Sequence, residues 1–220
     1  MLTTNSFRRN PSAALLAVQL LGLVLYPLME ASASSRALFN AFGLLVLGAA
    51  LWVVRRSPWL TWLGILLAFP VVVLSVGSAV SPSPGFLVLM VALEALFYFY
   101  ATGSLIAYML QDWVATTDEL FAAGATFTLL AWAFAHLYVV CEALIPGSFT
   151  SAGDVPARTW TELLYLSVVV LSSVGLSDIM PVTPMARALV MLESFAGVMY
   201  VALVVSRLVS MSAVTRKSGS

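Results

Sequence analysis

The segment Thr159–Pro184, TWTELLYLSVVVLSSVGLSDIMPVTP, holds one apolar run that is too short to cross a bilayer comfortably as a helix. The run extends from Leu163 to Leu176 and is bounded by Glu162 and Asp178. A helix needs about 20 apolar residues to span the hydrocarbon core, and runs of about 10 to 14 are more typical of segments that enter and return. We therefore expect this segment to dip into the membrane and leave on the side from which it came.

Polar residues at the two ends of the segment predict where helices begin. Thr159 followed three residues later by Glu162 is a capping box, so a helix is expected to start there. About three turns later the chain reaches two serines and then Gly175, where that helix should end. Thr183 and Pro184 supply an N-cap and a proline at the first position of a following helix.

The stretch between these two predicted helices should be irregular, and its surroundings favour a cation. Irregular backbone at membrane depth is tolerated only where protein buries it or where it lines a water-filled cavity. A helix that enters from outside points its partially negative C-terminal end toward the membrane centre. Asp178 adds a carboxylate at the outer mouth. The alternative is that Gly175 is only a small residue for close helix packing, which is common in membrane helices.

Six further apolar runs are candidates for membrane spans on length. They are Ala13–Met29, Ala37–Val54, Trp59–Val80, Phe86–Leu110, Leu120–Ile145 and Met185–Val209. Of the 220 residues, 61% are hydrophobic and 9% are charged, a balance that excludes an ordinary soluble domain. We predict an all-α membrane protein with six transmembrane helices and a re-entrant helix and loop between the fifth and the sixth.

Charge and cysteine content exclude several other classes of protein. Ten basic and ten acidic residues give a formal net charge of zero, so nothing indicates nucleic-acid binding. Cys141 is the single cysteine, which rules out an intrachain disulfide and a multi-cysteine metal site. The scattered acids and the lone His136 do not supply the cluster that a membrane enzyme would need, so we expect no catalysis.

The distribution of basic residues predicts the orientation of the spans. With six spans both termini share one side, and we expect that side to be the cytoplasm, with the protein in the plasma membrane. The residues gathered there are Arg8, Arg9, Arg55, Arg56, Arg207, Arg216 and Lys217, against Arg36, Arg158 and Arg187 on the other side. The loop before the fifth span is an exception, because it carries only the acids Asp112, Asp118 and Glu119.

The order span, short helix, irregular stretch, aspartate, proline, span resembles the two-transmembrane ion-channel domain of potassium channels, whose filter signature is T-V-G-Y-G-D. Here the matching residues are Ser173-Val174-Gly175-Leu176-Ser177-Asp178. The flanks Pro146–Phe149, Asp178–Arg187 and Glu193–Gly197 look like a bacterial branch of that family. The likeness covers about Asp118 to Val209.

This resemblance implies a homotetramer in the lipid bilayer, with four copies of the loop around one axis. In such filters, backbone carbonyls replace the hydration shell of the ion. The carbonyls of Val174, Gly175 and Leu176, with the hydroxyl or carbonyl of Ser173, would then hold a monovalent cation, K⁺ or Na⁺, and no other cofactor is implied. Gly197 would match the inner-helix glycine at which gating bends are often placed.

Departures from the family signature fall in the outer half of the filter. Leu176 replaces an aromatic residue that hydrogen-bonds the short helix, and the matching position on that helix is Leu166. Ser177 replaces a glycine at positive φ, where a side chain costs about 1 to 2 kcal/mol. Ser173 for threonine is a mild change. Our hypothesis is that the outer half adopts another conformation, which weakens selectivity for K⁺ over Na⁺.

Four ionisable residues lie at or within the apolar runs, where a charge is costly and often functional. We expect Glu142, near a span end, to be solvated and Glu94 to be neutral and hydrogen-bonded between helices. Glu193 is expected to support the pore by bonding the short helix, with a direct role in the ion pathway as the alternative. A metal site at His136 is not expected because no companion ligands are at suitable spacing, although a pH sensor is an alternative.

We therefore divide the chain into a four-helix N-terminal membrane domain (1–112), a pore domain (113–212) and a short tail (213–220). No run before the pore carries a series of basic residues, so conduction should depend little on voltage. The predicted function is a potassium-channel-like cation channel. The alternatives are a weakly selective or non-conducting relative with a degenerate filter, and a secondary transporter, for which we find no inverted repeat.

Overall fold

The computed structural model describes residues 10–30, 35–55, 61–80, 84–111, 116–150 and 158–217. These residues form seven helices: α2 (Pro11–Glu30), α3 (Ser35–Val54), α4 (Thr61–Val80), α5 (Pro84–Met109), α6 (Thr117–Leu144), α7 (Trp160–Leu171) and α8 (Pro184–Lys217). Several residues of the orientation prediction lie outside the described residues or side chains: Arg8, Arg9, Arg36, Arg56, Asp112, Arg216 and Lys217.

Each apolar run of the sequence becomes one helix, and proline marks the start of three of them. Pro11, Pro84 and Pro184 occupy the first positions of α2, α5 and α8, where the missing N–H has no partner in any case and the fixed φ suits a helix. The prediction of an all-α chain is confirmed over the described residues, in which the only β-pairing is one isolated bridge between Phe149 and Pro181.

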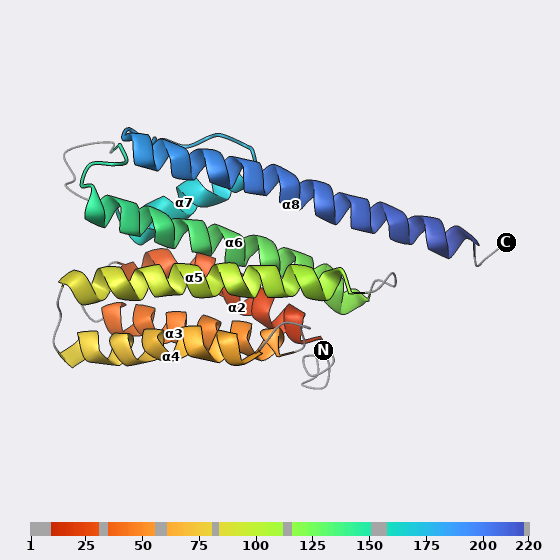
Figure 1. Ribbon diagram of the computed structural model, residues 1–220, viewed down its shortest axis with the longest axis horizontal. Helices are drawn as coiled ribbons and strands as arrows, with labels where there is room; N and C mark the ends of the chain where they lie inside the picture. Colours follow the sequence, from red (N-terminus) through yellow and green to blue (C-terminus); the bar gives the residue numbers. More distant parts are fainter. Residues whose placement is uncertain are drawn as a thin grey trace.

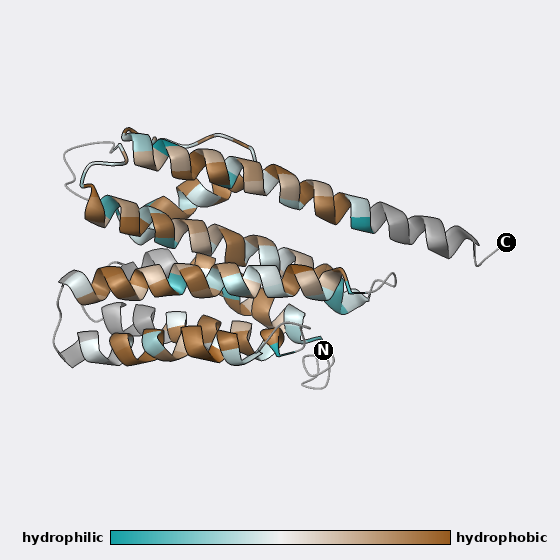
Figure 2. Ribbon diagram, viewed as in Figure 1, coloured by the Kyte–Doolittle hydropathy of each residue, from teal (hydrophilic) through white to brown (hydrophobic). Residues whose placement is uncertain are grey.

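Three helices within the described residues are long and apolar enough to cross a membrane, namely Gly85–Met109, Thr117–Leu144 and Pro184–Arg207. The shorter apolar helical stretches are Pro11–Leu25, Phe42–Val54, Thr61–Ser75 and Trp160–Leu171. Hydrophobic residues occur along most of the length of the helices (Figure 2), and many large apolar side chains are exposed, among them Val24, Phe69, Leu144 and Phe195. An exposed apolar surface of this extent is stable in lipid and unstable in water. The helices therefore indicate a membrane protein, while the number of six spans stays a prediction.

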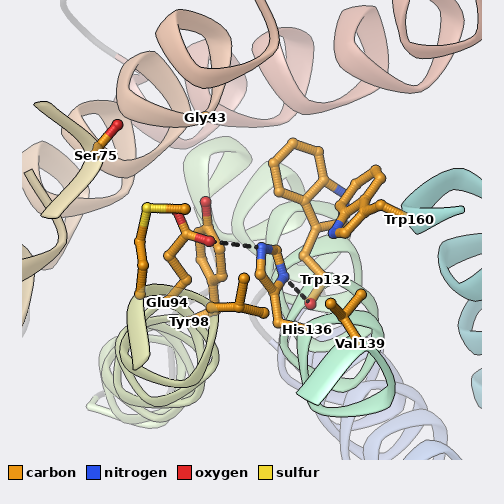
Figure 3. Close-up of a pocket in the computed structure, with 10 residues that line it drawn as sticks. Gly43, Ser75, Glu94, Tyr98, Trp132, His136, Val139 and Trp160 are labelled. Atoms are coloured by element: carbon orange, nitrogen blue, oxygen red, sulfur yellow. Dashed lines mark hydrogen bonds and ion pairs between the residues drawn. The ribbon is translucent and has the colours of Figure 1, made fainter. Parts of the chain in front are cut away.

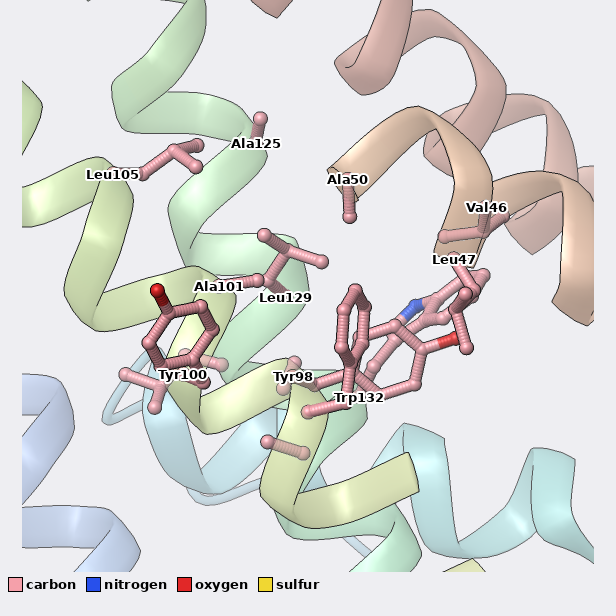
Figure 4. Close-up of a cluster of buried hydrophobic side chains, with 14 of the residues drawn as sticks. Val46, Leu47, Ala50, Tyr98, Tyr100, Ala101, Leu105, Ala125, Leu129 and Trp132 are labelled. Atoms are coloured by element: carbon pink, nitrogen blue, oxygen red, sulfur yellow. The ribbon is translucent and has the colours of Figure 1, made fainter. Parts of the chain in front are cut away.

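Helix α6 is central to the bundle and packs against α2, α5, α7 and α8 (Figure 1). Its buried face is rich in alanine, with Ala125, Ala131, Ala133 and Ala135 completely buried. Small residues of this kind let helix backbones approach closely in membranes. Figure 4 shows the largest cluster of buried side chains, in which Tyr98 of α5 lies beside Trp132 of α6, with ring centroids 5.9 Å apart.

Helix α7 starts beside one end of α6 and stops partway along the bundle, and the connecting segment (172–183) then returns to the end where α7 began (Figure 1). Backbone hydrogen bonds fix this return: Thr150 N donates to the Met180 carbonyl at 2.8 Å, and Val182 N donates to the Ser148 carbonyl at 2.9 Å. The residues just after α6 and those just before α8 are therefore joined. Helix α7 and the connecting segment therefore form an excursion along the bundle that begins and ends at the same end of α6.

The turn after α6 is held by Glu142, a partly exposed residue near the end of the helix. Its carboxylate oxygens accept hydrogen bonds from Gly147 N at 2.9 Å and from Phe149 N at 3.2 Å. A carboxylate that accepts backbone N–H groups fixes a turn that would otherwise leave those donors without partners. Sequence spacing does not reveal this role, because it depends on how the chain folds back after Leu144.

The acids at the start of α6 are buried, although the sequence suggested an acidic loop without a basic partner. Asp118 accepts hydrogen bonds from Ser12 N at 3.0 Å, Ser12 Oγ at 2.9 Å and the Tyr108 hydroxyl at 3.2 Å. Glu119 forms a 3.1 Å ion pair with Arg207 of α8. Both acids also lie in the first turn of α6, where a negative charge is favourable. Asp118 and Glu119 thus connect α2, α5 and α8 to one end of α6.

Candidate functional site

The short helix α7 begins as the capping box predicts. Thr159 Oγ1 accepts from Glu162 N at 3.3 Å, and Glu162 Oε2 accepts from Thr159 N at 2.8 Å. Arg158 adds an ion pair to Glu162 at 3.2 Å. The helix ends at Leu171, so the predicted start and the predicted end are both confirmed. The following α8 also begins as expected, because Thr183 Oγ1 accepts from Ala186 N at 3.3 Å.

The C-terminus of α7 is closed by Ser173 in a left-handed conformation, with φ of 61°. Ser173 N donates to the Val170 carbonyl at 3.0 Å, and Val174 N donates to the Val169 carbonyl at 3.1 Å. This pair of bonds is the Schellman motif, whose left-handed position is usually glycine. The residue that the resemblance assigned to the first filter position is thus also the residue that ends the short helix.

Gly175 follows in the left-handed region as well, with φ of 72°. A Cβ atom at this position would meet no atom within 4 Å, so close packing does not explain the glycine. The interpretation of Gly175 as a helix-packing residue is therefore wrong, since the residue lies outside the helices and is exposed. A side chain there is disfavoured by the backbone conformation itself.

Ser177 does not lie in the left-handed region, in contrast to the glycine of the family signature. Its Oγ accepts a hydrogen bond from Ile179 N at 3.1 Å, which forms a local turn typical of serine. The strain that we expected for a side chain at this position is consequently absent, because the backbone takes a different path. The backbone at Ser177 therefore carries no left-handed strain, and a filter conformation that differs from that of the family stays a prediction.

A hydrogen bond between the short helix and the connecting segment was not predicted from the sequence. The Tyr165 hydroxyl donates to the Leu176 carbonyl at 2.7 Å. We had matched Leu166 to the aromatic position of the family, but Leu166 is buried and Tyr165 beside it makes the contact. The apolar character of Leu166 and Leu176 concealed the link, since the acceptor is a backbone atom that no sequence pattern marks.

The side of α7 that faces away from the connecting segment is joined to α8 by Glu193, which is completely buried. The Glu193 carboxyl contacts Ser167 Oγ of α7 and the Tyr138 hydroxyl of α6. A bond from Glu193 to the short helix is the arrangement that we expected from the sequence. It connects three helices around one carboxyl group.

Gly197, one turn after Glu193, lies against the last residue of α7. A Cβ atom at Gly197 would overlap the Leu171 carbonyl oxygen and lie 2.9 Å from its carbonyl carbon. The observed conformation therefore needs glycine here so that α8 can pass the end of the short helix. This is a packing reason for a residue that the sequence associated with bending.

A cavity of about 180 Å³ lies between the N-terminal helices and the start of α7 (Figure 3). Glu94 of α5 and His136 of α6 meet at its wall, with Oε2 and Nε2 3.1 Å apart. His136 Nδ1 lies 2.6 Å from the Trp132 carbonyl oxygen, so Nδ1 carries the donor proton. The His136 ring also contacts Trp160, the first residue of α7, with ring centroids 5.7 Å apart. The hydrogen-bonded Glu94 between helices is the arrangement that we expected.

The predicted filter residues follow α7 in the connecting segment, and most of them are exposed. Ser173, Val174, Gly175, Leu176 and Asp178 are exposed, and Ser177 is partly exposed. The side chains of Val174 and Leu176 are 59% and 72% exposed in the single chain. Within the described residues no three His, Cys, Asp or Glu side chains are grouped to hold a metal ion.

Residues 126–213 match the model of a protein family described as an ion channel. The matched range, about two fifths of the chain, contains most of α6, all of α7, the connecting segment and most of α8. No curated protein and no solved structure gives a significant match to the chain. The family match and the long apolar helices together indicate a membrane protein with an ion-channel domain.

Proposed function

We propose that this chain is one subunit of a potassium-channel-like channel for monovalent cations, formed by four copies around one pore. The observation that carries the proposal is the excursion between α6 and α8. A capped helix of 12 residues ends in an exposed, irregular segment, and that segment returns to the level where the helix began. Its place inside the range that matches an ion-channel family supports the same function.

The electrostatics of α7 favour a cation at the predicted filter residues 173–178. The negative end of the helix dipole lies at Leu171, directly before this segment. No basic side chain lies between Leu171 and Asp178, and Asp178 adds an exposed carboxylate. With four copies around one axis, four helix ends and four carboxylates would act on the same ion.

The exposed face of α8 supports assembly with further copies. One face of the helix packs on α6 and α7, and the other carries large apolar side chains that are 54 to 68% exposed in the single chain, namely Met191, Leu192, Phe195, Val198 and Met199. The filter residues are exposed as well. A tetramer would cover the sides of α8 and bring the four connecting segments together.

The remaining features of the proposal concern the whole chain in its membrane. Six spans would place both termini in the cytoplasm of a plasma-membrane protein, with residues 1–112 as an N-terminal membrane domain beside the pore domain 113–212 and the tail 213–220. The end of α3, which Arg55 follows, and the second half of α8, which contains Arg207, lie at one end of the bundle (Figure 1). The starts of α7 and α8, beside Arg158 and Arg187 in the sequence, lie at the other end (Figure 1). The channel is proposed to respond little to voltage.

Weak selectivity between K⁺ and Na⁺ is the second part of the proposal. Ser177 leaves the left-handed conformation of the family signature and binds Ile179 N. A filter in which the outer residues follow another path presents fewer ordered carbonyl rings to the ion. A channel of this kind passes both ions.

Cation flux from liposomes with the purified, full-length protein tests the function. We expect K⁺ and Na⁺ to cross at similar rates and the flux to be insensitive to voltage. Gly175→Ala should reduce flux at least tenfold, because alanine strains the backbone at φ of 72°. Gly48→Ala is the matched control, since Gly48 lies in α3 with no atom within 4 Å of an added Cβ.

Three results would contradict the proposal, wholly or in part. Absence of flux for every monovalent cation would identify a non-conducting relative. Flux that survives Gly175→Ala unchanged would mean that the connecting segment does not line the pathway. Strong K⁺ selectivity in the unmodified protein would leave the channel in place and refute the weak-selectivity part alone.

A further inference from the structure

Tyr165 of α7 and Leu176 of the connecting segment form the direct link between the short helix and the outer half of the predicted filter. The tyrosine hydroxyl donates to the Leu176 backbone carbonyl at 2.7 Å. The Leu176 side chain is 72% exposed, so it points away from the protein while its carbonyl points back toward α7. The orientation of this one carbonyl is therefore set by a side chain eleven residues earlier.

Carbonyl direction matters because ion selection in a filter of this type depends on which oxygens face the ion. A carbonyl that accepts a hydrogen bond from the helix behind the segment cannot also face the opposite side, where an ion would pass. Four such carbonyls, one from each copy, would be missing from the outer coordination ring. Water would fill their place and leave the ion partly hydrated there.

We infer that Tyr165 is a selectivity-determining positioning residue, which holds the Leu176 carbonyl out of the ion path. The inference rests on the proposed channel function and extends it, since it assigns the weak selectivity to one hydrogen bond. Release of this bond frees the carbonyl to turn toward the pore. The channel should then favour K⁺, because a further ring of carbonyl oxygens takes the place of water.

Tyr165→Phe is a suitable variant because it removes one hydroxyl and keeps the ring. The Tyr165 side chain is 49% exposed and the carbonyl that it binds is at the surface, so neither the ring nor the released carbonyl is left in a dry interior. The matched control is Tyr200→Phe. The Tyr200 hydroxyl also donates to a backbone carbonyl, that of Ala123, but this contact joins α8 to α6 away from the connecting segment.

The experiment measures the K⁺ to Na⁺ permeability ratio from reversal potentials of the full-length protein in planar bilayers. We expect Tyr165→Phe to raise the ratio at least threefold and Tyr200→Phe to leave it unchanged. 4-Aminophenylalanine at position 165 restores a donor at the same place and should return the ratio to the original value. A purely structural role of the ring would not give this return.

The possible failures are distinguishable. If the unmodified protein conducts and Tyr165→Phe does not raise the ratio, the inference is wrong and the channel function stands. If the phenylalanine and the 4-aminophenylalanine variants show the same raised ratio, the hydrogen bond is not the cause and the inference is also wrong. If the unmodified protein passes no current, the proposed function and the inference fall together.

Discussion

Ser167 of α7 and Glu193 of α8 are joined by a buried contact between Oγ and Oε1, and this contact fixes how protons are distributed around the carboxyl group. Ser167 Oγ also lies 2.7 Å from the Ala131 carbonyl oxygen, and the Tyr138 hydroxyl contacts the other carboxyl oxygen. A serine hydroxyl has one proton and cannot donate to two acceptors. If Ser167 donates to Ala131, Glu193 must be protonated and donate to Ser167.

The arrangement in which Ser167 donates to Ala131 and Glu193 is protonated leads to a prediction for Glu193→Gln. The amide can donate to Ser167 and accept from Tyr138, so this variant should lose less than about 1 kcal/mol of stability. Glu193→Ala removes the carboxyl group that the Ser167 and Tyr138 hydroxyls both contact, and it leaves a buried cavity. This variant should cost about 2 to 4 kcal/mol of stability. Thermal unfolding in detergent would measure both variants. A glutamine variant as unstable as the alanine variant would show that a carboxylate is required.

The left-handed Ser173 leads to a prediction that runs against the family signature. Ser173→Gly should stabilise the end of α7, since glycine adopts φ of 61° at no steric cost, and the gain should be about 1 kcal/mol. Ser173→Thr restores the residue of the signature and should nevertheless destabilise, because a β-branched side chain is unfavourable at positive φ.

Thermal unfolding of these two variants can be compared with that of Ser172→Thr. Ser172 has φ of −76°, so threonine there carries no left-handed penalty. Equal stability of the threonine and serine forms at position 173 would contradict the conformation described for this residue.

Gly197 should be intolerant of any side chain. Gly197→Ala places a methyl group on the Leu171 carbonyl, so α8 must move away from the end of α7. Overpacking of this kind costs about 1 to 3 kcal/mol, and the displacement should also alter flux. Gly48→Ala, in an open part of α3, should be neutral or slightly stabilising. A Gly197→Ala protein with normal unfolding temperature and normal flux would contradict the packing.

The Glu94–His136 contact should contribute to stability. With Nδ1 bound to the Trp132 carbonyl, the 3.1 Å contact at Nε2 needs one proton between the two groups. Glu94→Gln can supply an N–H donor at the same place, so its unfolding temperature should stay close to that of the unmodified protein. Glu94→Ala leaves His136 Nε2 without this partner and should cost about 1 to 3 kcal/mol.

Thermal unfolding in detergent would measure both variants. Equal unfolding temperatures for the glutamine and alanine variants would contradict a stabilising contact between Glu94 and His136. Cation flux of the same two variants would report whether the contact of His136 with Trp160 carries the change to α7.

Features that depend on neighbouring residues could be predicted from the sequence. The start of α7 follows from the Thr159–Glu162 capping box and the start of α8 from Thr183 and Pro184, because caps satisfy backbone groups within one turn. The apolar runs likewise become helices in lipid, where each backbone group must find its partner within the segment. The family resemblance was also accessible, since it depends on the order of such local signals.

Features that depend on distant residues were missed or misjudged. The hydrogen bonds by which Glu142 holds the turn after α6 were not predicted, nor were the partners of Asp118 and Glu119 on α2, α5 and α8. Tyr165 was overlooked because its acceptor is a backbone carbonyl. In each case a polar side chain forms a hydrogen bond or an ion pair with a residue whose proximity cannot be inferred from sequence spacing.

The amino-acid order alone was sufficient for the helical class, the helix limits around 159–184 and the position of the irregular segment, because short-range hydrogen bonding and apolar length govern all three. The conformation of that segment was decided by tertiary contacts. Whether Ser177 is strained, where the Leu176 carbonyl points and why residue 197 lacks a side chain depend on how α7 and α8 pack, and packing is a property of the folded chain as a whole.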